Sequence, residues 1–518
     1  MLKRFTFLLF GLLFALSGIA QDFSYDGINY TVIDPVAKTV KTKDGGYNPD
    51  LQAGNNVSGD IIIPESVEYL GKAYTVVAIG EYSFIFCGEL TGIKLPDSVT
   101  KIGVDAFRGC SNLTSIEIPS SVINIGSSAF SGCSNLTSVE LPSSLTNIEA
   151  GLFEGCTGLV SVVIPSSVTK IGIYAFYECT NLTSIEIPSS VTEIGEAAFM
   201  YCTSLTSVEL PSSLTNIEGG LFGGCTGLVS VVIPNYVTEI GASAFVRCSN
   251  LASIEIPNYV TEIGKYAFSG CSNLTSIEIP SSVTVIGSIA FSGCTNLSTV
   301  VLRGDVKGFG DRVWTGCQNI STIIYRTNDP TSANKNIFDD TVYSQATLYL
   351  PEEAIAKVNN IEPWNGFSKI KNIVDSGYEL QAGDDFEYNG INYTVIDPVA
   401  KTVKTKDGKY DQAGNNVSGD IIIPEVVEYQ GASYDVVAIG DYSFTNCSQL
   451  TAVTIPCSVT KIGDNAFWGC SGLIKAEFAS IESICNIEFV GISSNPLSNA
   501  HHLYIDGEEV TEVIIPET

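Results

Sequence analysis

Among the residue types in this chain, cysteine has the spacing that most clearly suggests a chemical role. The chain holds 15 cysteines, and most of them recur at an unbroken interval of 23 residues, at Cys87, Cys110, Cys133, Cys156, Cys179, Cys202, Cys225, Cys248, Cys271, Cys294 and Cys317. An odd number of thiols cannot all pair within one chain, and cysteines in a line do not form the cluster of four that a zinc site needs. We expect mostly buried, reduced thiols, with some bridged pairs as the alternative.

A second series, at a strand position that we expect to be exposed, lies seven residues after each of these cysteines, at Lys94, Glu117, Glu140, Val163, Glu186, Glu209, Val232, Glu255, Glu278, Val301 and Ile324. Like charges directly opposite each other on neighbouring strands destabilise a sheet. The paired glutamates therefore form either a solvated face that salt screens or a binding site for a cation or a basic partner. Tyr236 and Tyr259 replace serine in the turn after a proline, where an exposed ring is either plain surface or a platform for a sugar or a protein.

Other catalytic chemistry has little support in the sequence. The two histidines, His501 and His502, are adjacent, and we read them as a surface loop. No nucleophile elbow, phosphate-binding loop or dinucleotide fingerprint appears. We predict a protein that is not an enzyme, with no catalytic residues, no cofactor and no metal site. A hydrolase that uses two carboxylates is a remote alternative, because carboxylate pairs can be drawn from any acidic surface.

The charge balance narrows the classes of partner. A formal net charge of −30 and a pI near 4.3 leave no basic footprint for phosphate backbones or anionic lipid. We therefore predict no nucleic acid partner, while cations, basic proteins and neutral glycans stay open. Beyond the N-terminal segment no stretch approaches 18 apolar residues, so we expect no membrane span.

Each interval between cysteines reads as one structural unit stacked on the last. In the stretch 113–118, Ile116 and Ile118 alternate with polar residues, which predicts a strand with one buried face that ends at Pro119. We expect Gly126 to form a corner with positive φ, and Phe130 to cover the far side of the core. Too few residues remain before the next strand for more than a 3₁₀ turn or one helical turn.

The motif C-x-x-L-x-x-I-x-I-P-x-x-V-x-x-I-G-x-x-A-F resembles the repeats of BspA-like bacterial leucine-rich repeat surface proteins, of the 23-residue class, over roughly 61–325 and 420–478. The resemblance implies a leucine-rich repeat solenoid of the α/β horseshoe class, β-rich with short 3₁₀ or helical turns. It also implies export and binding to host or neighbouring-cell components, and it implies no catalytic residues.

Two stretches of sequence longer than the single repeat are also duplicated. The stretch 27–44 recurs as 390–407, and residues 134–202 closely repeat as 203–271. We predict two arrays with β-rich N-terminal caps. The expected division is a signal peptide over 1–20, a cap over 21–60, a first array over 61–325, a C-terminal cap and linker over 326–385, a second cap over 386–419, a second short array over 420–478, and an irregular segment over 479–518 leading toward a further repeat.

The N-terminal segment has the features of a secretory signal, with Lys3 and Arg4 before an apolar run and Gly18 and Ala20 before the expected cut. We therefore expect a secreted or cell-surface protein. The leading hypothesis is a binding or adhesion protein whose solenoid face engages host proteins, glycans or other cells. The alternative is a structural spacer of the cell envelope without a specific ligand. The sequence names neither the ligand, the surface anchor nor the oligomeric state.

Overall fold

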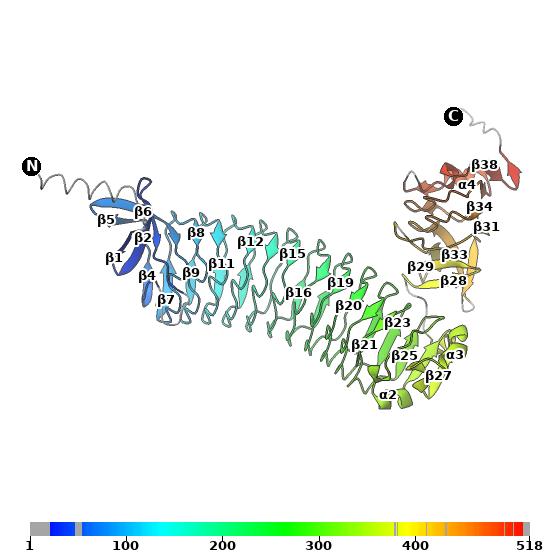
Figure 1. The fold of residues 1–518 in the computed structure, drawn as a ribbon, viewed down its shortest axis with the longest axis horizontal. Helices are drawn as coiled ribbons and strands as arrows, with labels where there is room; N and C mark the ends of the chain where they lie inside the picture. Colours follow the sequence, from blue (N-terminus) through cyan, green and yellow to red (C-terminus); the bar gives the residue numbers. More distant parts are fainter. Residues whose placement is uncertain are drawn as a thin grey trace, which may run out of the picture.

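The structure is a computed structural model that describes residues 21–46, 54–377, 380, 382–410, 412–429, 432–491, 493–500 and 502–510. The predicted signal peptide, His501 and the last residues of the predicted C-terminal segment lie outside this part of the chain. Figure 1 shows a long β-solenoid whose C-terminal end carries a second, shorter array at a steep angle. The solenoid has about 18 turns and little helix, which confirms the predicted fold class.

Most turns of the first array contribute two short parallel strands. The first strand carries the position seven after the cysteine, and its bounds are β7 Leu90–Lys94, β9 Ser115–Glu117, β11 Ser138–Glu140, β13 Ser161–Val163, β16 Ser207–Glu209, β18 Ser230–Val232, β21 Ser276–Ile279, β23 Thr299–Leu302 and β25 Thr322–Tyr325. Equivalent residues pair in parallel, as Val139 does with Val162. The middle residue of each triplet points into the core, as the alternation predicts.

The second strand has only two residues in each turn and was not predicted. These strands are β8 Lys101–Ile102, β10 Asn124–Ile125, β12 Asn147–Ile148, β14 Lys170–Ile171, β15 Glu193–Ile194, β17 Asn216–Ile217, β19 Glu239–Ile240, β20 Glu262–Ile263, β22 Val285–Ile286 and β24 Gly308–Phe309. A pair this short leaves no alternation to detect in the sequence, because one buried isoleucine fits a turn equally well.

The glycine that follows the second strand has a different role from the predicted one. Gly126 does not adopt positive φ, so that prediction is wrong; the left-handed residues of its turn are Ser128 and Gly132. A Cβ atom on Gly126 would lie 2.5 Å from the backbone nitrogen of Val104 in the preceding turn of the solenoid. Glycine is needed here because two successive turns approach closely, and not because of its own backbone angle.

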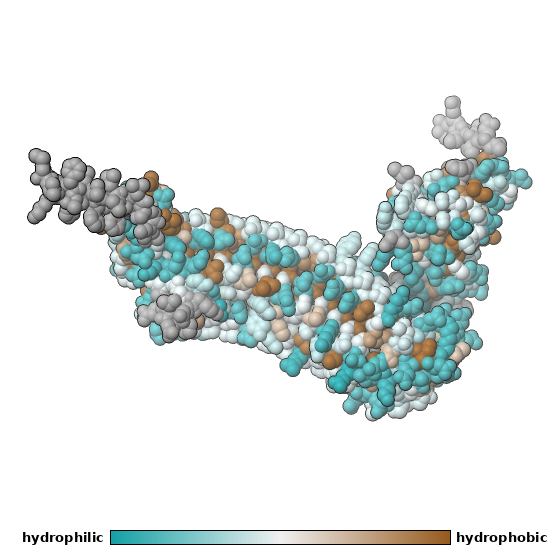
Figure 2. All heavy atoms as spheres, in the orientation of Figure 1, coloured by the Kyte–Doolittle hydropathy of each residue, from teal (hydrophilic) through white to brown (hydrophobic). Residues whose placement is uncertain are grey.

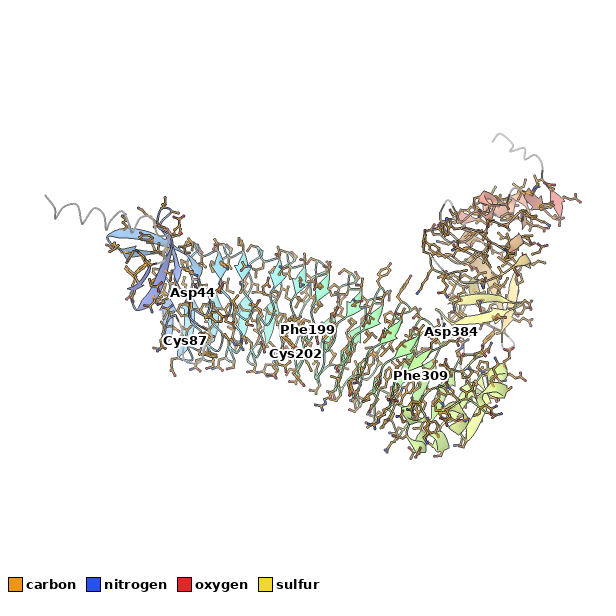
Figure 3. All side chains as sticks on the ribbon, in the orientation of Figure 1. Asp44, Cys87, Phe199, Cys202, Phe309 and Asp384 are labelled. Atoms are coloured by element: carbon orange, nitrogen blue, oxygen red, sulfur yellow. The ribbon has the colours of Figure 1, made fainter. Side chains whose placement is uncertain are left out.

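The core of the first array is a stack of aromatic rings beside a line of thiols. The rings of Phe176, Phe199 and Phe222 stack with centroids 5.4 and 5.7 Å apart and nearly parallel planes. The stack begins at Phe84 and ends on Trp314 and Phe338. Figure 3 places Phe199 and Cys202 in the middle of the array, where both are fully buried.

The ladder cysteines are free and buried. From Cys110 onward each ladder thiol donates a hydrogen bond to a phenylalanine carbonyl oxygen, as Cys202 does to Phe176 at 3.1 Å, whereas Cys87 donates to the carbonyl oxygen of Asn55. Burial raises the pKa of the Cys156 and Cys225 thiols to about 12 from an ordinary value of 9.0. This agrees with the expectation of reduced thiols. Off the ladder, Cys457 and Cys485 are exposed.

We expect these thiols to be unreactive in the native protein, because apolar burial suppresses the thiolate that reacts. Alkylation without reductant should modify Cys457 and Cys485 first, and most of the ladder only after denaturant is added; a mass shift near zero in denaturant would mean disulfides. The same pKa shift makes stability fall as the pH rises above about 9, because the unfolded chain then loses thiol protons that the native state keeps. Urea midpoints between pH 8 and pH 10 measure this loss.

Both arrays open with a β-rich cap, as predicted. The first consists of β1 Asp22–Tyr25, β2 Ile28–Asp34, β3 Thr39–Thr42, β4 Gly59–Ile62, β5 Ser66–Tyr69 and β6 Lys72–Ile79. The second repeats it with β28 Asp385–Tyr388, β29 Ile391–Asp397, β30 Thr402–Thr405, β31 Gly419–Ile422, β32 Val426–Tyr429 and β33 Ala432–Ile439. In each cap the third strand pairs in parallel with the sixth. This pairing connects the antiparallel strands of the cap to the parallel strands of the solenoid.

The ends of the arrays are less regular. The first array closes with η1 Lys335–Ile337, α2 Asp340–Gln345, β26 Thr347–Leu350, α3 Glu352–Val358, η2 Trp364–Gly366, β27 Lys369–Asn372 and η3 Ile373–Ser376. The second continues with β34 Leu450–Ile455, β35 Lys461–Ile462, β36 Lys475–Phe478, α4 Ile481–Cys485, β37 Glu488–Phe489, η4 Pro496–Ser498, β38 His502–Ile505 and β39 Glu508–Glu509.

A buried ionic cluster joins the two arrays. Asp384, which immediately precedes β28, is fully buried and lies 2.5 Å from Nη1 of Arg326 and 3.3 Å from Nε of Arg303. The guanidinium of Arg326 also lies over the ring of Tyr429 in the second cap, 5.7 Å from its centroid. Figure 3 shows Asp384 at the junction. We call Arg303, Arg326, Asp384 and Tyr429 the junction clamp.

Candidate binding faces

The predicted glutamates lie on one side of the first array, which we call the strand face and define as Lys94, Glu117, Glu140, Val163, Glu186, Glu209, Val232, Glu255 and Glu278. All of these side chains are exposed except Glu278, which is half-buried. They come together because parallel pairing in register places equivalent residues side by side. Val232 keeps 74% of its surface accessible, so the valines interrupt the acidic pairs with apolar patches.

The ends of the acidic series are neutralised by ion pairs. Nζ of Lys94 lies 3.7 Å from Glu117, and Arg303 of the junction clamp pairs with Glu278. Glu186 and Glu209 instead stand directly opposite each other through a parallel bridge. The repulsion expected from the sequence is therefore concentrated in the middle of the strand face.

Two members of the series are not on an exposed face, and the sequence expectation for them is wrong. Val301 and Ile324 are only 7% and 4% exposed, because they pack with Tyr349 against Ile373 of η3. The chain that leaves the first array folds back over these strands and covers them. The accessible strand face therefore stops before β23.

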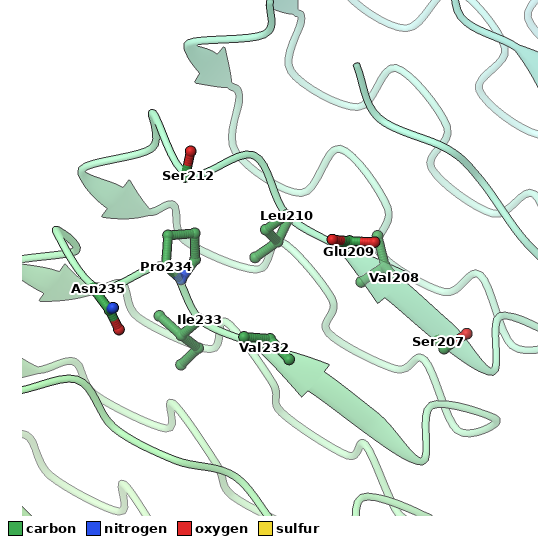
Figure 4. A pocket seen from close by; sticks show the side chains of 9 residues that line it. All are labelled: Ser207, Val208, Glu209, Leu210, Ser212, Val232, Ile233, Pro234 and Asn235. Atoms are coloured by element: carbon green, nitrogen blue, oxygen red, sulfur yellow. The ribbon is translucent and has the colours of Figure 1, made fainter. Parts of the chain in front are cut away.

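A shallow hollow of about 470 Å³ lies on the strand face between two neighbouring turns of the solenoid. Figure 4 shows Ser207 and Glu209 on β16, Val232 on β18, and Pro234 and Asn235 in the turn that follows. A carboxylate, a serine hydroxyl and an apolar floor thus meet at one place. This combination suits a partner with hydrogen-bond donors beside an apolar group.

Tyr236 and Tyr259 extend this hollow. Their rings lie 5.9 Å apart at 35° to each other, and 65% and 60% of their surfaces are exposed. Tyr236 directly follows Asn235, so the two rings continue the rim of the hollow from one turn of the solenoid to the next. The structure therefore places Tyr236 directly after a residue that lines the same hollow as Glu209, whereas Glu140 and Glu117 lie three and four turns of the solenoid before Glu209.

The part of the chain that the structure describes contains neither a candidate metal site nor a candidate membrane-spanning helix. There, no group of three or more histidine, cysteine, aspartate or glutamate side chains can hold a metal ion. Nor does any helix in the same residues have the length and apolar character needed to cross a membrane. His502 is exposed and pairs with Glu509, but it begins strand β38 and does not lie in the loop expected from the sequence.

Sequence reasoning missed a second aromatic cluster at the surface, in which Tyr174 is exposed and Tyr177 and Tyr201 are half-buried. Tyr174, Tyr177 and Tyr201 contact one another in the turns before Cys179 and Cys202. Their signal was present in the near-identical blocks 134–202 and 203–271, which differ at these positions. On the side shown in Figure 2, hydrophobic residues form small scattered groups along the first array, and no single large patch marks a site.

The repeats decide the family. A family model for the BspA-type leucine-rich repeat region matches residues 77–205, 150–261, 192–321, 238–362 and 430–500, which together make up more than half of the chain. The chain belongs to this family. BspA-type proteins are leucine-rich repeat surface proteins and are generally not enzymes.

Solved structures include similar leucine-rich repeat proteins. One from Bacteroides ovatus is 26% identical, covering 90% of this chain and 99% of that chain, with a TM-score of 0.49. A leucine-rich cell-surface protein from Faecalibacterium prausnitzii is 26% identical over 60% of this chain and 96% of that chain, with a TM-score of 0.39. The pneumococcal vaccine antigen PcpA is 21% identical over 69% of this chain and 99% of that chain, with a TM-score of 0.47. A search of curated proteins finds no match.

Proposed function

We propose that this BspA-type protein is an exported, non-enzymatic binding protein that uses its strand face to engage a protein or glycan of a host or neighbouring cell. The observation that carries the proposal is the meeting of Glu209, the hollow beside Val232 and the exposed Tyr236–Tyr259 pair on neighbouring turns. Export rests on the N-terminal segment 1–20, which lies outside the described residues.

The two hydrophobic cores support an organisation in two modules. One core runs from Ile28 to Phe367 and the other from Leu380 to Ala500. We propose that the first module presents the binding face. The second module, held by the junction clamp, lengthens the protein beyond that face. A pure spacer would use the same two modules without any ligand, so binding measurements must separate these roles.

The tyrosine pair offers a matched test of binding. The other copy of the duplicated block carries Ser167 and Ser190 where Tyr236 and Tyr259 stand, so Tyr236→Ser with Tyr259→Ser restores residues that the same turn already accepts. Capture of host extracellular proteins and glycans on the immobilised protein should fall about tenfold for the strand-face ligand, with an unchanged melting temperature. If this variant and the variant Glu186→Gln with Glu209→Gln both capture as much ligand as the unaltered protein, the result would favour the spacer.

The acidic pair gives a separate expectation for stability. Replacing Glu186 and Glu209 by glutamine removes the repulsion between opposed carboxylates, so the free energy of unfolding at low salt should rise by about 0.2–1 kcal/mol. The control is Glu278→Gln, which removes a carboxylate that pairs with Arg303 and should not stabilise the protein. Urea unfolding at two salt concentrations measures both variants, and no gain for the double variant would show that solvent already screens the pair.

A further inference from the structure

The turn before each ladder cysteine contains a backbone position that favours glycine. The residue immediately before the cysteine has positive φ throughout the first array, and it is glycine at Gly109, Gly132, Gly155, Gly224, Gly270, Gly293 and Gly316. At Glu178, Tyr201 and Arg247 the same left-handed conformation is held by residues with a side chain, which costs free energy that glycine avoids. Phe86 is a further exception at the start of the array, and only Glu178 and Tyr201 stand in successive turns. Strain of this kind gathers where a side chain is needed for something other than the fold.

Three tyrosines form a continuous aromatic group in these two turns. The ring of Tyr177 lies 5.5 Å from that of Tyr174 and 5.6 Å from that of Tyr201, nearly perpendicular to both. Tyr174 also has positive φ and is 42% exposed, and Ile173 beside it is 48% exposed. Tyr201 lies over Gly224 of the next turn, where any side chain would collide with its ring. We call Tyr174, Tyr177 and Tyr201 the tyrosine ridge.

The internal duplication shows that the fold does not require these rings. In the second block the equivalent residues are Ser243, Val246 and Gly270, whereas Glu140, Val163 and Glu186 are retained as Glu209, Val232 and Glu255. Both blocks form the same turns around the same buried phenylalanines, with Phe176 matching Phe245. The ridge residues therefore belong to the surface of one copy only, and the other copy folds with small or aliphatic side chains at the same positions.

The ridge has acidic surroundings. Burial, and then the carboxylate of Glu178, raise the pKa of Tyr177, and Glu154 adds to the same effect from the neighbouring turn. Glu196 is exposed in the turn that leads to Tyr201. Aromatic faces beside carboxylates attract the guanidinium and ammonium groups of a partner, and the net charge of −30 draws such groups toward the protein from a distance.

We infer that the tyrosine ridge is a second binding surface, separate from the strand face, that receives an extended arginine- or lysine-bearing segment of a partner protein. Each cationic side chain would lie against a tyrosine ring and approach a carboxylate of Glu154 or Glu178. The two surfaces are on different sides of the short second strand, since the ridge follows β14 and the Tyr236 turn precedes β19. The inference therefore does not rest on the function proposed for the strand face.

The test uses the whole chain and a fluorescent nona-arginine peptide, with nona-citrulline as its neutral match. The variant Tyr174→Ser, Tyr177→Val, Tyr201→Gly installs the residues of the other block. At about 0.15 M ionic strength it should bind nona-arginine about tenfold or more weakly than the unaltered protein in an anisotropy titration. Glu239→Gln with Glu262→Gln, which removes two exposed carboxylates outside both surfaces, serves as the control for general attraction and should change the affinity less than about twofold.

Three results would overturn the inference: equal affinity of the ridge variant, a larger loss in the Glu239–Glu262 control, or equally tight binding of nona-citrulline. A ridge that binds neutral oligosaccharides and not the arginine peptide would also reject the basic segment as the partner. Tyr201→Gly alone keeps the test decisive if the triple variant does not fold, because seven other turns of the array already carry glycine there. This single change should still weaken nona-arginine binding measurably, and an unchanged affinity would count against the ridge.

Discussion

Replacing Phe199 by alanine should lower the free energy of unfolding by about 3–5 kcal/mol. The ring is fully buried between Phe176 and Phe222, and it packs in the middle of a stack that extends in both directions. Removing it leaves a cavity that neighbouring turns cannot close, because each of them is held in register by parallel strand pairs. Chemical denaturation followed by far-UV circular dichroism measures the loss.

Two variants bracket this effect. Phe199→Leu keeps most of the buried volume and should cost well under the alanine value. Tyr236→Ala, whose ring is exposed, should stay within about 0.5 kcal/mol of the unaltered protein. Because a solenoid couples each unit to its neighbours, the alanine variant should also broaden the transition or divide it into two. A loss below about 1 kcal/mol would show that the stack relaxes around the cavity.

Replacing Asp384 by alanine should release the second array from the first. The change leaves the Arg326 side chain, which is 2% exposed, buried without its carboxylate, and breaking one member of a buried pair typically costs about 3–5 kcal/mol. The protein can avoid this cost by undocking the second cap, which returns the guanidinium to water. We therefore expect a larger radius of gyration in small-angle scattering and a separate melting transition for the second array.

The controls for the junction clamp follow from the same electrostatics. Lys357→Ala removes an ion pair with Asp329 that is largely exposed, so it should change neither the scattering curve nor the melting profile. Asp384→Ala combined with Arg326→Met removes both charges and should recover much of the docked form. Scattering curves that stay identical for the Asp384 variant would mean that other contacts across the junction, such as the hydrogen bond from Ser281 to Asp385, hold the arrays without the clamp.

Features that lie within one repeat could be predicted from the sequence. The alternation around Ile116 indicated a strand with one buried face, and the line of cysteines indicated buried thiols, because period and polarity are local properties. The strand-face glutamates were found in the same way, since a constant interval places equivalent residues side by side. The role of Gly126 was missed because its nearest contact is the backbone of the preceding turn, which its own neighbours in sequence do not reveal.

The repeat interval by itself determined the solenoid, the identity of its core residues and the face that carries the glutamates, because each turn packs on the next with the same side chains. Only the tertiary structure decided which parts of that face are accessible and where side chains gather. The burial of Ile324 by Ile373 and the pairing of Arg326 with Asp384 join residues from different units with no common period. The rings of Tyr177 and Tyr201 meet for a similar reason: they occupy different positions in successive turns, and their contact depends on how far each side chain reaches across the gap.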